Sequence, residues 1–233
     1  MGLWSRLRKS VDELGAVVTT QHFIDRALSS VSAGRARLIT YALMAQPIGA
    51  DALAGVRSDA NTVVQELHPG EPLVDSLPRP AAINLQRWAD GAQCLAATVK
   101  GGFAGTIWVA RGHYDEDEVR CLYRLADAAG SVWDYDVYVT PRYRGGRLLA
   151  RLWQATDARL SAQGVRWSFS RIALANPASM AAHQRMGARR VGLAGFLVLG
   201  PWQMAVFSLP PFVHVSLHAG SRPTVQLRAP APP

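Results

Sequence analysis

Cysteine is nearly absent from the chain, which carries only Cys94 and Cys121 among its 233 residues. Two cysteines that are not spaced as CxxC provide neither a disulfide framework nor a zinc site. The sequence therefore predicts no metal site, and a reducing cytoplasm is the expected compartment.

The sequence also lacks a long apolar run. No stretch approaches the ~20 consecutive apolar residues that a membrane-spanning helix needs. The N-terminal segment MGLWSRLRKSVDELG lacks the uninterrupted apolar region of a signal peptide. Arg6 occupies the position where a myristoylation signal has serine or threonine, so neither a spanning helix nor this lipid anchor is expected.

Charged residues are scarce, at 18% of the chain, whereas hydrophobic residues make up 49%. This balance excludes global disorder and permits a sizeable core. The formal net charge of +8 favours anionic partners such as a coenzyme phosphate, a nucleic acid or a membrane face. Because the basic residues are scattered and are not interleaved with aromatics, dedicated nucleic-acid binding is not expected.

The N-terminal segment, residues 1–34, is predicted to be a helical extension. A second helix is expected at residues 21–31, ending near Gly34. The first helix is amphipathic, and such a helix either packs on its own domain or lies in a membrane interface. Peripheral membrane contact through residues 1–15 therefore stays open. The apolar residues at helical spacing are Leu3, Trp4, Leu7, Val11 and Leu14.

Residues 35–209 are predicted to form one α/β domain, and residues 210–233 a proline-rich tail whose last five residues are disordered. Lys100-Gly101-Gly102 is a good hairpin signal between two strands. Helices are expected at residues 80–88, 144–163 and 177–186. Strands are expected at residues 36–47, 94–99, 103–111, 119–125, 132–139, 165–174, 191–199 and 202–209.

A glycine-rich turn lies between the strand expected at 132–139 and the long helix. Gly145 and Gly146 let backbone N–H groups approach a ligand without a Cβ in the way. The helix start offers unpaired N–H groups and a positive dipole end, and Arg144 and Arg147 add charge for phosphate groups. The turn is a candidate pyrophosphate site, although a plain structural connection has the same pattern. It matches neither a P-loop nor a dinucleotide fingerprint.

Two segments together resemble the motifs of the GNAT N-acetyltransferase superfamily, in its bacterial form. Val137-Tyr138-Val139-Thr140-Pro141-Arg142-Tyr143-Arg144-Gly145-Gly146 resembles that family's strand and pyrophosphate loop. Asn176-Pro177-Ala178-Ser179, followed by His183 and Met186-Gly187-Ala188, resembles its second motif, where an asparagine opens a helix. The two motifs lie about as far apart as the family requires, and the core of the resemblance covers residues 132–188.

The resemblance implies the GNAT acyl-CoA N-acyltransferase fold, an α/β fold whose mixed, mostly antiparallel twisted sheet is flanked by helices. It implies an N-acetyltransferase that uses acetyl-CoA as co-substrate and acylates an amine-bearing acceptor. The pantetheine arm of the coenzyme is expected along residues 137–139, bonded to backbone groups like another strand. The implied coenzyme-binding residues are Val137, Tyr138, Val139, Arg144, Gly145, Gly146, Arg147, Leu148, Leu149, Asn176 and Ser179.

The loop departs from the family pattern at two positions. The family loop usually reads Arg/Gln-x-x-Gly-x-Gly/Ala, and counting from Arg144 this chain has Arg147 and Leu149 at the small-residue positions. A Cβ there crowds the phosphates unless the loop is rearranged, and Arg147 compensates with charge. Two other functions remain open: an acyl-CoA-binding protein without turnover, and a basic adaptor for a membrane surface or a nucleic acid. A homodimer also remains open.

Three residues are candidates for proton transfer. The family often has a tyrosine at the position of His183 that protonates the leaving thiolate, and a histidine with a pKa near ~6.5 suits that role. A surface histidine is the alternative. Asp134 and Asp136 share one face of a regular strand because side chains alternate, and a partly buried carboxylate beside a cleft serves as a base. Pairing of these aspartates with nearby arginines is the alternative.

Overall fold

The structure is a computed structural model that describes residues 30, 32, 35–49, 53, 55–57 and 59–231. The two N-terminal helices expected within residues 1–34 fall almost entirely outside the described residues. The chain divides into two compact units. Unit 1 comprises Met1–Ala45, Tyr114–Ala126 and Arg171–Pro233, and unit 2 comprises Gln46–His113 and Asp127–Ser170.

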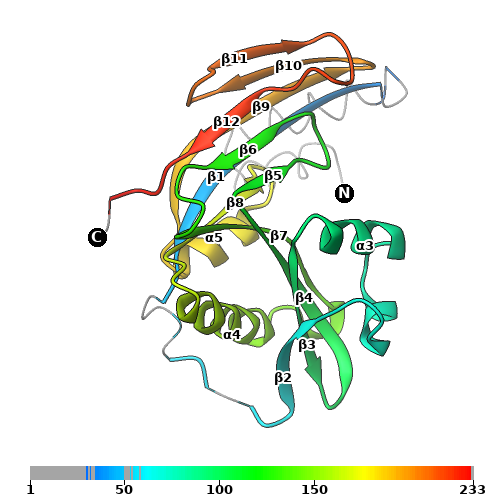
Figure 1. The fold of residues 1–233 in the computed structure, drawn as a ribbon, viewed down its shortest axis with the longest axis vertical. Helices are drawn as coiled ribbons and strands as arrows, with labels where there is room; N and C mark the ends of the chain where they lie inside the picture. The colour runs from blue at the N-terminus through cyan, green and yellow to red at the C-terminus, as the bar shows by residue number, and fades with distance from the viewer. Residues whose placement is uncertain are drawn as a thin grey trace, which may run out of the picture. The chain divides into compact units, whose positions relative to one another are not determined.

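Unit 2 is built on a sheet with the strand order β8-β7-β4-β3-β2 (Figure 1). The strands β2, β3, β4 and β7 pair antiparallel, whereas β8 pairs parallel with β7. The elements are β2 (Thr62–Leu67), η2 (Pro72–Ser76), α3 (Ala81–Ala89), β3 (Gln93–Val99), β4 (Gly102–Arg111), β7 (Ser131–Val139), η3 (Pro141–Tyr143), α4 (Leu148–Ala162) and β8 (Trp167–Ala173), which crosses into unit 1 after Ser170.

Two helices cover opposite faces of this sheet. On β2, Leu67 packs in a cluster with Trp108 and Trp88 of α3, while the preceding residue Glu66 pairs with Arg159 of α4. Successive strand residues point to opposite faces, so α3 and α4 lie on different sides. Helix α4 buries an apolar stripe that includes Leu152 and Trp153. Helix α3 instead contacts the sheet through Trp88, whose ring lies 5.0 Å from that of Trp108.

Strand β7 carries a β-bulge in its second half. Thr106 of β4 is opposite Tyr138 and Trp108 is opposite Tyr135, so Ile107 alone faces two residues of β7. One of these two residues, Asp136, has a φ of 50°. A non-glycine residue in this left-handed region marks a local distortion that surrounding contacts must hold. The bulge interrupts the alternation of side chains along β7.

The pairing between β7 and β8 is short. It joins only Ser131, Val132 and Trp133 to residues 167–169. Within unit 2, the rest of β7 therefore pairs with β4 on one side and has no β8 partner on the other. Residues 137–139 at the end of β7 thus have no β8 residue opposite them, and a strand edge of this kind is a template for another extended chain.

Unit 1 has two sheets (Figure 1). The first has the order β11-β10-β9-β1, all antiparallel, and the second has the order β12-β6-β5 with β12 parallel to β6. The elements are β1 (Ala36–Pro47), β5 (His113–Asp115), β6 (Leu122–Leu125), α5 (Pro177–Arg185), β9 (Arg189–Leu199), β10 (Trp202–Phe207), β11 (Val213–Ser216) and β12 (Thr224–Leu227).

The predicted fold class is confirmed: the structure is α/β, with a mixed, mostly antiparallel sheet flanked by helices. Two expectations need correction. The long helix begins at Leu148 rather than at residue 144, because Gly145 has a φ of 74° that a helix cannot contain. The segment after residue 210 is not a structureless tail, since it contributes β11 and β12. No helix in the described ranges is long and apolar enough to cross a bilayer.

Candidate functional site

The start of α4 leaves backbone donors without partners inside the helix. Pro141 opens η3, and a turn at residues 144–147 leads into the helix. The first intrahelical bond runs from the N–H of Arg151 to the carbonyl of Arg147 at 3.0 Å. The N–H groups of Leu148, Leu149 and Ala150 therefore lack an acceptor within the helix, and the positive end of the helix dipole lies among them.

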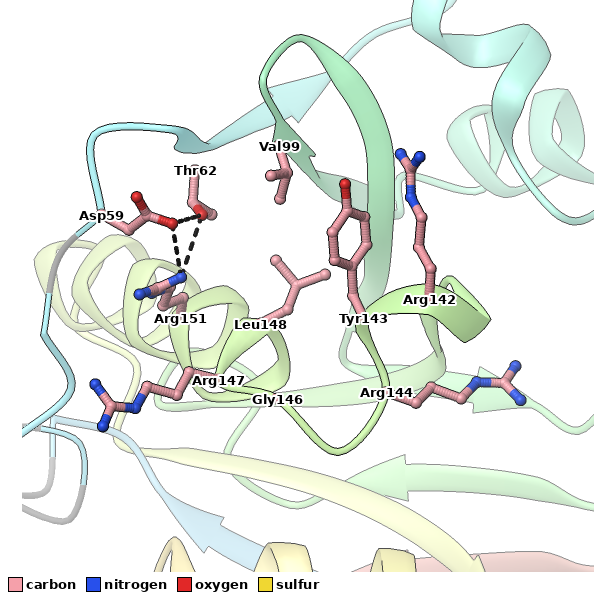
Figure 2. A pocket seen from close by; sticks show the side chains of 10 residues that line it. All are labelled: Asp59, Thr62, Val99, Arg142, Tyr143, Arg144, Gly146, Arg147, Leu148 and Arg151. Carbon is pink, nitrogen blue, oxygen red and sulfur yellow. Dashed lines mark hydrogen bonds and ion pairs between the residues drawn. The ribbon is translucent and has the colours of Figure 1, made fainter.

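A pocket of about 250 Å³ lies beside this helix start. Figure 2 shows Val99, Leu148 and Tyr143 in the middle of the view, with arginine side chains around them. Four arginines and one carboxylate line the pocket, so its charge is positive. The lining residues are Asp59, Thr62, Val99, Arg142, Tyr143, Arg144, Gly146, Arg147, Leu148 and Arg151.

Two of the arginines are held in place by bonds within unit 2. Arg151 Nη1 lies 2.9 Å from Asp59 Oδ2, and its Nε donates to the carbonyl of Arg57 at 3.2 Å. Arg144 Nε donates to the carbonyl of Val139 at 3.0 Å, which ties the turn to the end of β7. Hydrogen bonds from the backbone of Asn61 and other donors hold the pKa of Asp59 below its usual range, so this carboxylate stays charged.

This arrangement suits a phosphorylated ligand. Fixed guanidinium groups donate charge-assisted hydrogen bonds to phosphate oxygens. A helix start with unpaired N–H groups adds further donors and a favourable dipole. The left-handed φ of 74° at Gly145 is one that residues with side chains rarely adopt, and there a Cβ would meet no atom within 4 Å. The turn therefore depends on glycine and is open to a ligand.

The structure brings four of the predicted coenzyme-binding residues to the pocket: Arg144, Gly146, Arg147 and Leu148. Gly145 and Leu149 lie in the same segment but do not line it. Sequence reasoning missed Arg151, although its spacing of four from Arg147 places both on one helix face. Asp59 and Thr62 come from a distant segment and had no signal in the sequence.

Arg147 occupies a position where the resembling family has a small residue. It is the N-cap residue of α4, with a φ of −86°, and its side chain is exposed. The guanidinium therefore adds charge at the rim of the pocket rather than filling it. Leu149 is half-buried and contributes no lining.

Val137, Tyr138 and Val139 form the end of β7, on the edge that has no β8 partner. The carbonyl of Val139 accepts the bond from Arg144. An extended ligand arm is able to pair with the remaining backbone groups there, which is the arrangement predicted for pantetheine. That contact stays a prediction.

Asp136 is engaged in an ion-pair cluster on the α3 side. Arg87 Nη1 lies 2.7 Å and Arg79 Nε 3.0 Å from Asp136 Oδ2. The Arg87 guanidinium also stacks 4.9 Å from the ring of Tyr135. Burial raises the pKa of Asp136, but the hydrogen bonds and charges of Arg79 and Arg87 outweigh burial and hold this pKa below its usual range. A carboxylate so held is a poor base.

Asp134 lies on the opposite side of the strand, in the interior beneath α4. It is 2% exposed and accepts a hydrogen bond from Ser168 Oγ at 2.7 Å. Burial, with a smaller effect from the charge of Asp157 of α4, raises its pKa to about 7. The expectation that Asp134 and Asp136 share one face is wrong, because the bulge at Asp136 breaks the alternation.

The raised pKa values of Asp134 and of its neighbour Asp157 predict a contribution to the pH dependence of stability. Burial also raises the pKa of Asp157 to about 7. The folded state then keeps protons that the unfolded chain, with a carboxyl pKa of ~3.9, releases. The contribution of these two carboxyls to the free energy of unfolding is therefore expected to be fully present below about pH 4 and to be lost as pH rises through about 7.

Urea denaturation at several pH values measures this dependence. Asp134→Asn should flatten the slope between about pH 4 and 7, because amides do not titrate. Asp75→Asn, at an exposed position, is the matched control and should leave the slope unchanged. An equal slope in wild type and Asp134→Asn would show that Asp134 is ionised in the folded protein.

His183 lies in α5, in unit 1, and only 6% of its surface is exposed. Burial lowers its pKa to about 4, so the imidazole is neutral at pH 7. A neutral imidazole in this setting is poorly suited to protonate a thiolate. The general-acid hypothesis for His183 therefore gains no support from its surroundings.

Asn176 caps α5 as the sequence predicts. Its Oδ1 accepts the N–H of Ser179 at 3.0 Å, and Pro177 occupies the first helical position. This bond gives Asn176 and Ser179 a structural role at the helix start. Their contact with a coenzyme stays a prediction. In the described ranges, no group of three His, Cys, Asp or Glu residues is arranged to hold a metal ion.

No protein-family model matches the chain, and no curated protein matches it. Among solved structures, a conserved protein of unknown function from Staphylococcus epidermidis is similar at 10% identity and a TM-score of 0.50, covering 86% of this chain and 82% of that one. A protein described as a member of the GNAT family, from Novosphingobium aromaticivorans, matches at 19% identity with a TM-score of 0.43, covering 66% of this chain and 62% of its own.

A tandem GNAT protein from the clavulanic acid biosynthesis pathway matches at 16% identity with a TM-score of 0.46, covering 66% of this chain and 50% of its own. The chain thus spans less than two thirds of the length of both GNAT proteins. At such low identity the likeness concerns the fold alone.

Proposed function

We propose that the protein is an acyl-CoA-dependent acyltransferase that moves an acetyl or other short acyl group to an amine. The observation that carries the proposal is the arginine-lined pocket beside the open start of α4. Phosphate groups are the ligands that this combination of guanidinium groups and free helix N–H donors binds best. The pyrophosphate of acyl-CoA supplies such groups.

The edge of β7 that has no β8 partner supports binding of the pantetheine arm of acyl-CoA. Residues 137–139 lead directly into the pocket, and their backbone groups on one side have no β8 partner. A pantetheine arm extended from phosphates in the pocket would run along this edge and form strand-like hydrogen bonds. The thioester would then lie near the bulge at Asp136, where the backbone direction changes.

The reaction needs few groups from the protein. The amine nitrogen forms a bond to the thioester carbonyl carbon, the carbon–sulfur bond breaks, and the sulfur leaves as the coenzyme thiol after taking up a proton. Asp136 is held by two arginines and Asp134 is buried, so in this proposal water accepts the amine proton. The proposal includes a cytoplasmic location, the compartment expected from the low cysteine content.

Thiol release from acetyl-CoA tests the proposal. The full chain is incubated with acetyl-CoA and a panel of primary amines, and free thiol is measured with a chromogenic disulfide. At least one amine is expected to raise thiol release well above the rate without amine. Calorimetry with acetyl-CoA is run in parallel, and the absence of any binding at millimolar coenzyme would refute the proposal.

A second candidate is an acyl-CoA-binding protein without turnover. The surroundings of Asp134, Asp136 and His183 favour it, because none of the three is placed as a ready acid or base. The same two assays separate the candidates. Coenzyme binding by calorimetry without thiol release for any amine would support binding alone.

A further inference from the structure

Three neighbouring strands in unit 1 present apolar side chains to solvent. Strands β9, β10 and β11 lie side by side (Figure 1). Six of these side chains have exposed fractions that run from 43% for Met204 to 58% for Val213. We call these six side chains the apolar face, which consists of Leu199, Trp202, Met204, Val206, Val213 and Val215.

The strand register puts these side chains on one side of the sheet. Trp202 is opposite Leu199 and Met204 is opposite Val215, and directly opposed residues point to the same face. Alternate residues of β10 point to the other side of the sheet and are buried there. The strand is therefore buried on one side and carries exposed apolar side chains on the other, a pattern typical of a strand that is covered on both sides. The buried alternate residues are Gln203, Ala205 and Phe207.

A helix already covers the neighbouring part of the same side. Met180 of α5 packs on Ala42 and Met44 of β1. Ala42 is opposite Leu193 of β9, which is 38% exposed, so the covered surface continues into the apolar face.

The apolar face is large for an unoccupied surface. At roughly 100 Å² for each half-exposed large side chain, its six residues amount to about 600 Å², the upper end of the range for the largest apolar patch on a monomer, and such patches are often functional. An amphipathic helix is a suitable cover, because its apolar stripe buries such a surface while its charged side stays in water.

We propose that the amphipathic segment formed by residues 3–14 of the same chain docks on the apolar face. The chain enters the described structure at the corner of this face: Ala36, the first residue of β1, is opposite Leu199. The carbonyl of Arg35 accepts the N–H of Gly200 at 2.7 Å, and Ser32 Oγ accepts the N–H of Ala36 at 2.7 Å. Residues 1–29 therefore connect directly to the edge of the face.

Sequence pattern and charge also favour this occupant. Leu3, Leu7, Val11 and Leu14 fall on one side of a helix, and Lys9 falls on the opposite side. A second copy of the chain would bring a second net charge of +8 to the same surface, and like charges oppose that association. Docking within one chain adds no such repulsion.

Disulfide trapping in the full chain tests the docking. Leu7→Cys combined with Met204→Cys should form an intrachain disulfide under mild oxidation. Lys9→Cys combined with Met204→Cys is the matched control, because residue 9 faces away from the apolar side, and it should form at least fivefold less. Cys94 and Cys121 are buried with pKa values raised to about 11 and about 12, so they react slowly.

Equal trapping of the two pairs, or disulfides formed only between chains, would overturn the proposal. Tryptic cleavage at Arg6, Arg8 and Lys9 gives a second measurement. Met204→Glu should raise the cleavage rate at least tenfold, because a charge on the face releases the helix. Val63→Glu, at an exposed position of unit 2, is the control. Cleavage of Met204→Glu at the rate of this control would contradict the docking.

Discussion

Arg147→Glu is expected to weaken acetyl-CoA binding by about 100-fold and to leave the fold unchanged. Arg147 is exposed at the pocket rim, so its substitution removes no core contact. A charge-assisted hydrogen bond to phosphate contributes about 1.5–3 kcal/mol, and each 1.4 kcal/mol is tenfold in affinity. Replacement by a carboxylate also introduces repulsion of the phosphates at the same place. Calorimetry at one fixed ionic strength measures the effect.

Arg111→Glu is the matched control for this variant. It makes the same change of charge at an exposed residue of unit 2 that does not line the pocket. If the pocket binds the phosphates, the control should lose only a small, salt-dependent fraction of affinity through the change in net charge. Equal losses in both variants would mean that general charge, and not the pocket, attracts the coenzyme.

Asp136→Ala is expected to lower the free energy of unfolding by about 3 kcal/mol or more. Its carboxylate neutralises Arg87, which is 8% exposed, and removal of one partner leaves an uncompensated buried charge. Alanine must also adopt the φ of 50° at the bulge, a conformation that aspartate tolerates better than alanine, and it lacks the bonds to Arg79 and Arg87 that hold residue 136 there. Urea denaturation at pH 7 measures the sum.

Two further substitutions separate charge from conformation at the bulge. Asp136→Gly removes the charge but accepts the positive φ, so it should be about 1 kcal/mol more stable than Asp136→Ala. The lowered pKa of Asp136 means that its contribution is present at neutral pH and is lost as pH falls through the folded pKa. The deficit of Asp136→Gly relative to wild type should therefore shrink in acid. Identical stability of the glycine and alanine variants would show that the bulge relaxes in the variants.

The elements of the fold were predictable because their patterns are local. The strand 36–47 and the hairpin at Lys100-Gly101-Gly102 follow from apolar content and turn chemistry, and the structure contains both. The pyrophosphate turn was found for the same reason. Its glycines and arginines are contiguous, and four of the predicted residues line the pocket.

The proton-transfer candidates were harder to assign, because their surroundings are tertiary. Regular alternation puts Asp134 and Asp136 on one face, but a bulge is set by pairing with β4 and by contacts with Arg79 and Arg87 from outside the strand. No residue next to Asp136 in the sequence indicates the bulge. Burial of His183 likewise depends on what α5 packs against, which the short helix does not reveal by itself.

The strands β11 and β12 were missed because each is only four residues long. Prolines before and between them gave the segment the composition of a tail. Short strands are fixed by their partners rather than by their own propensity. Val213–Ser216 pairs with β10, and Thr224–Leu227 pairs with β6.

The parallel pairing of β12 with β6 also bears on how the protein is made. Leu122 and its partner Thr224 lie about 100 residues apart, and contacts of such long range form late in folding. During synthesis, one edge of β6 has no partner until residues 224–227 have left the ribosome. Val225 and Leu227 are fully buried once in place, so a nascent or C-terminally shortened chain exposes an apolar strand edge. Chaperone demand and aggregation should therefore rise sharply for chains that end before residue 224.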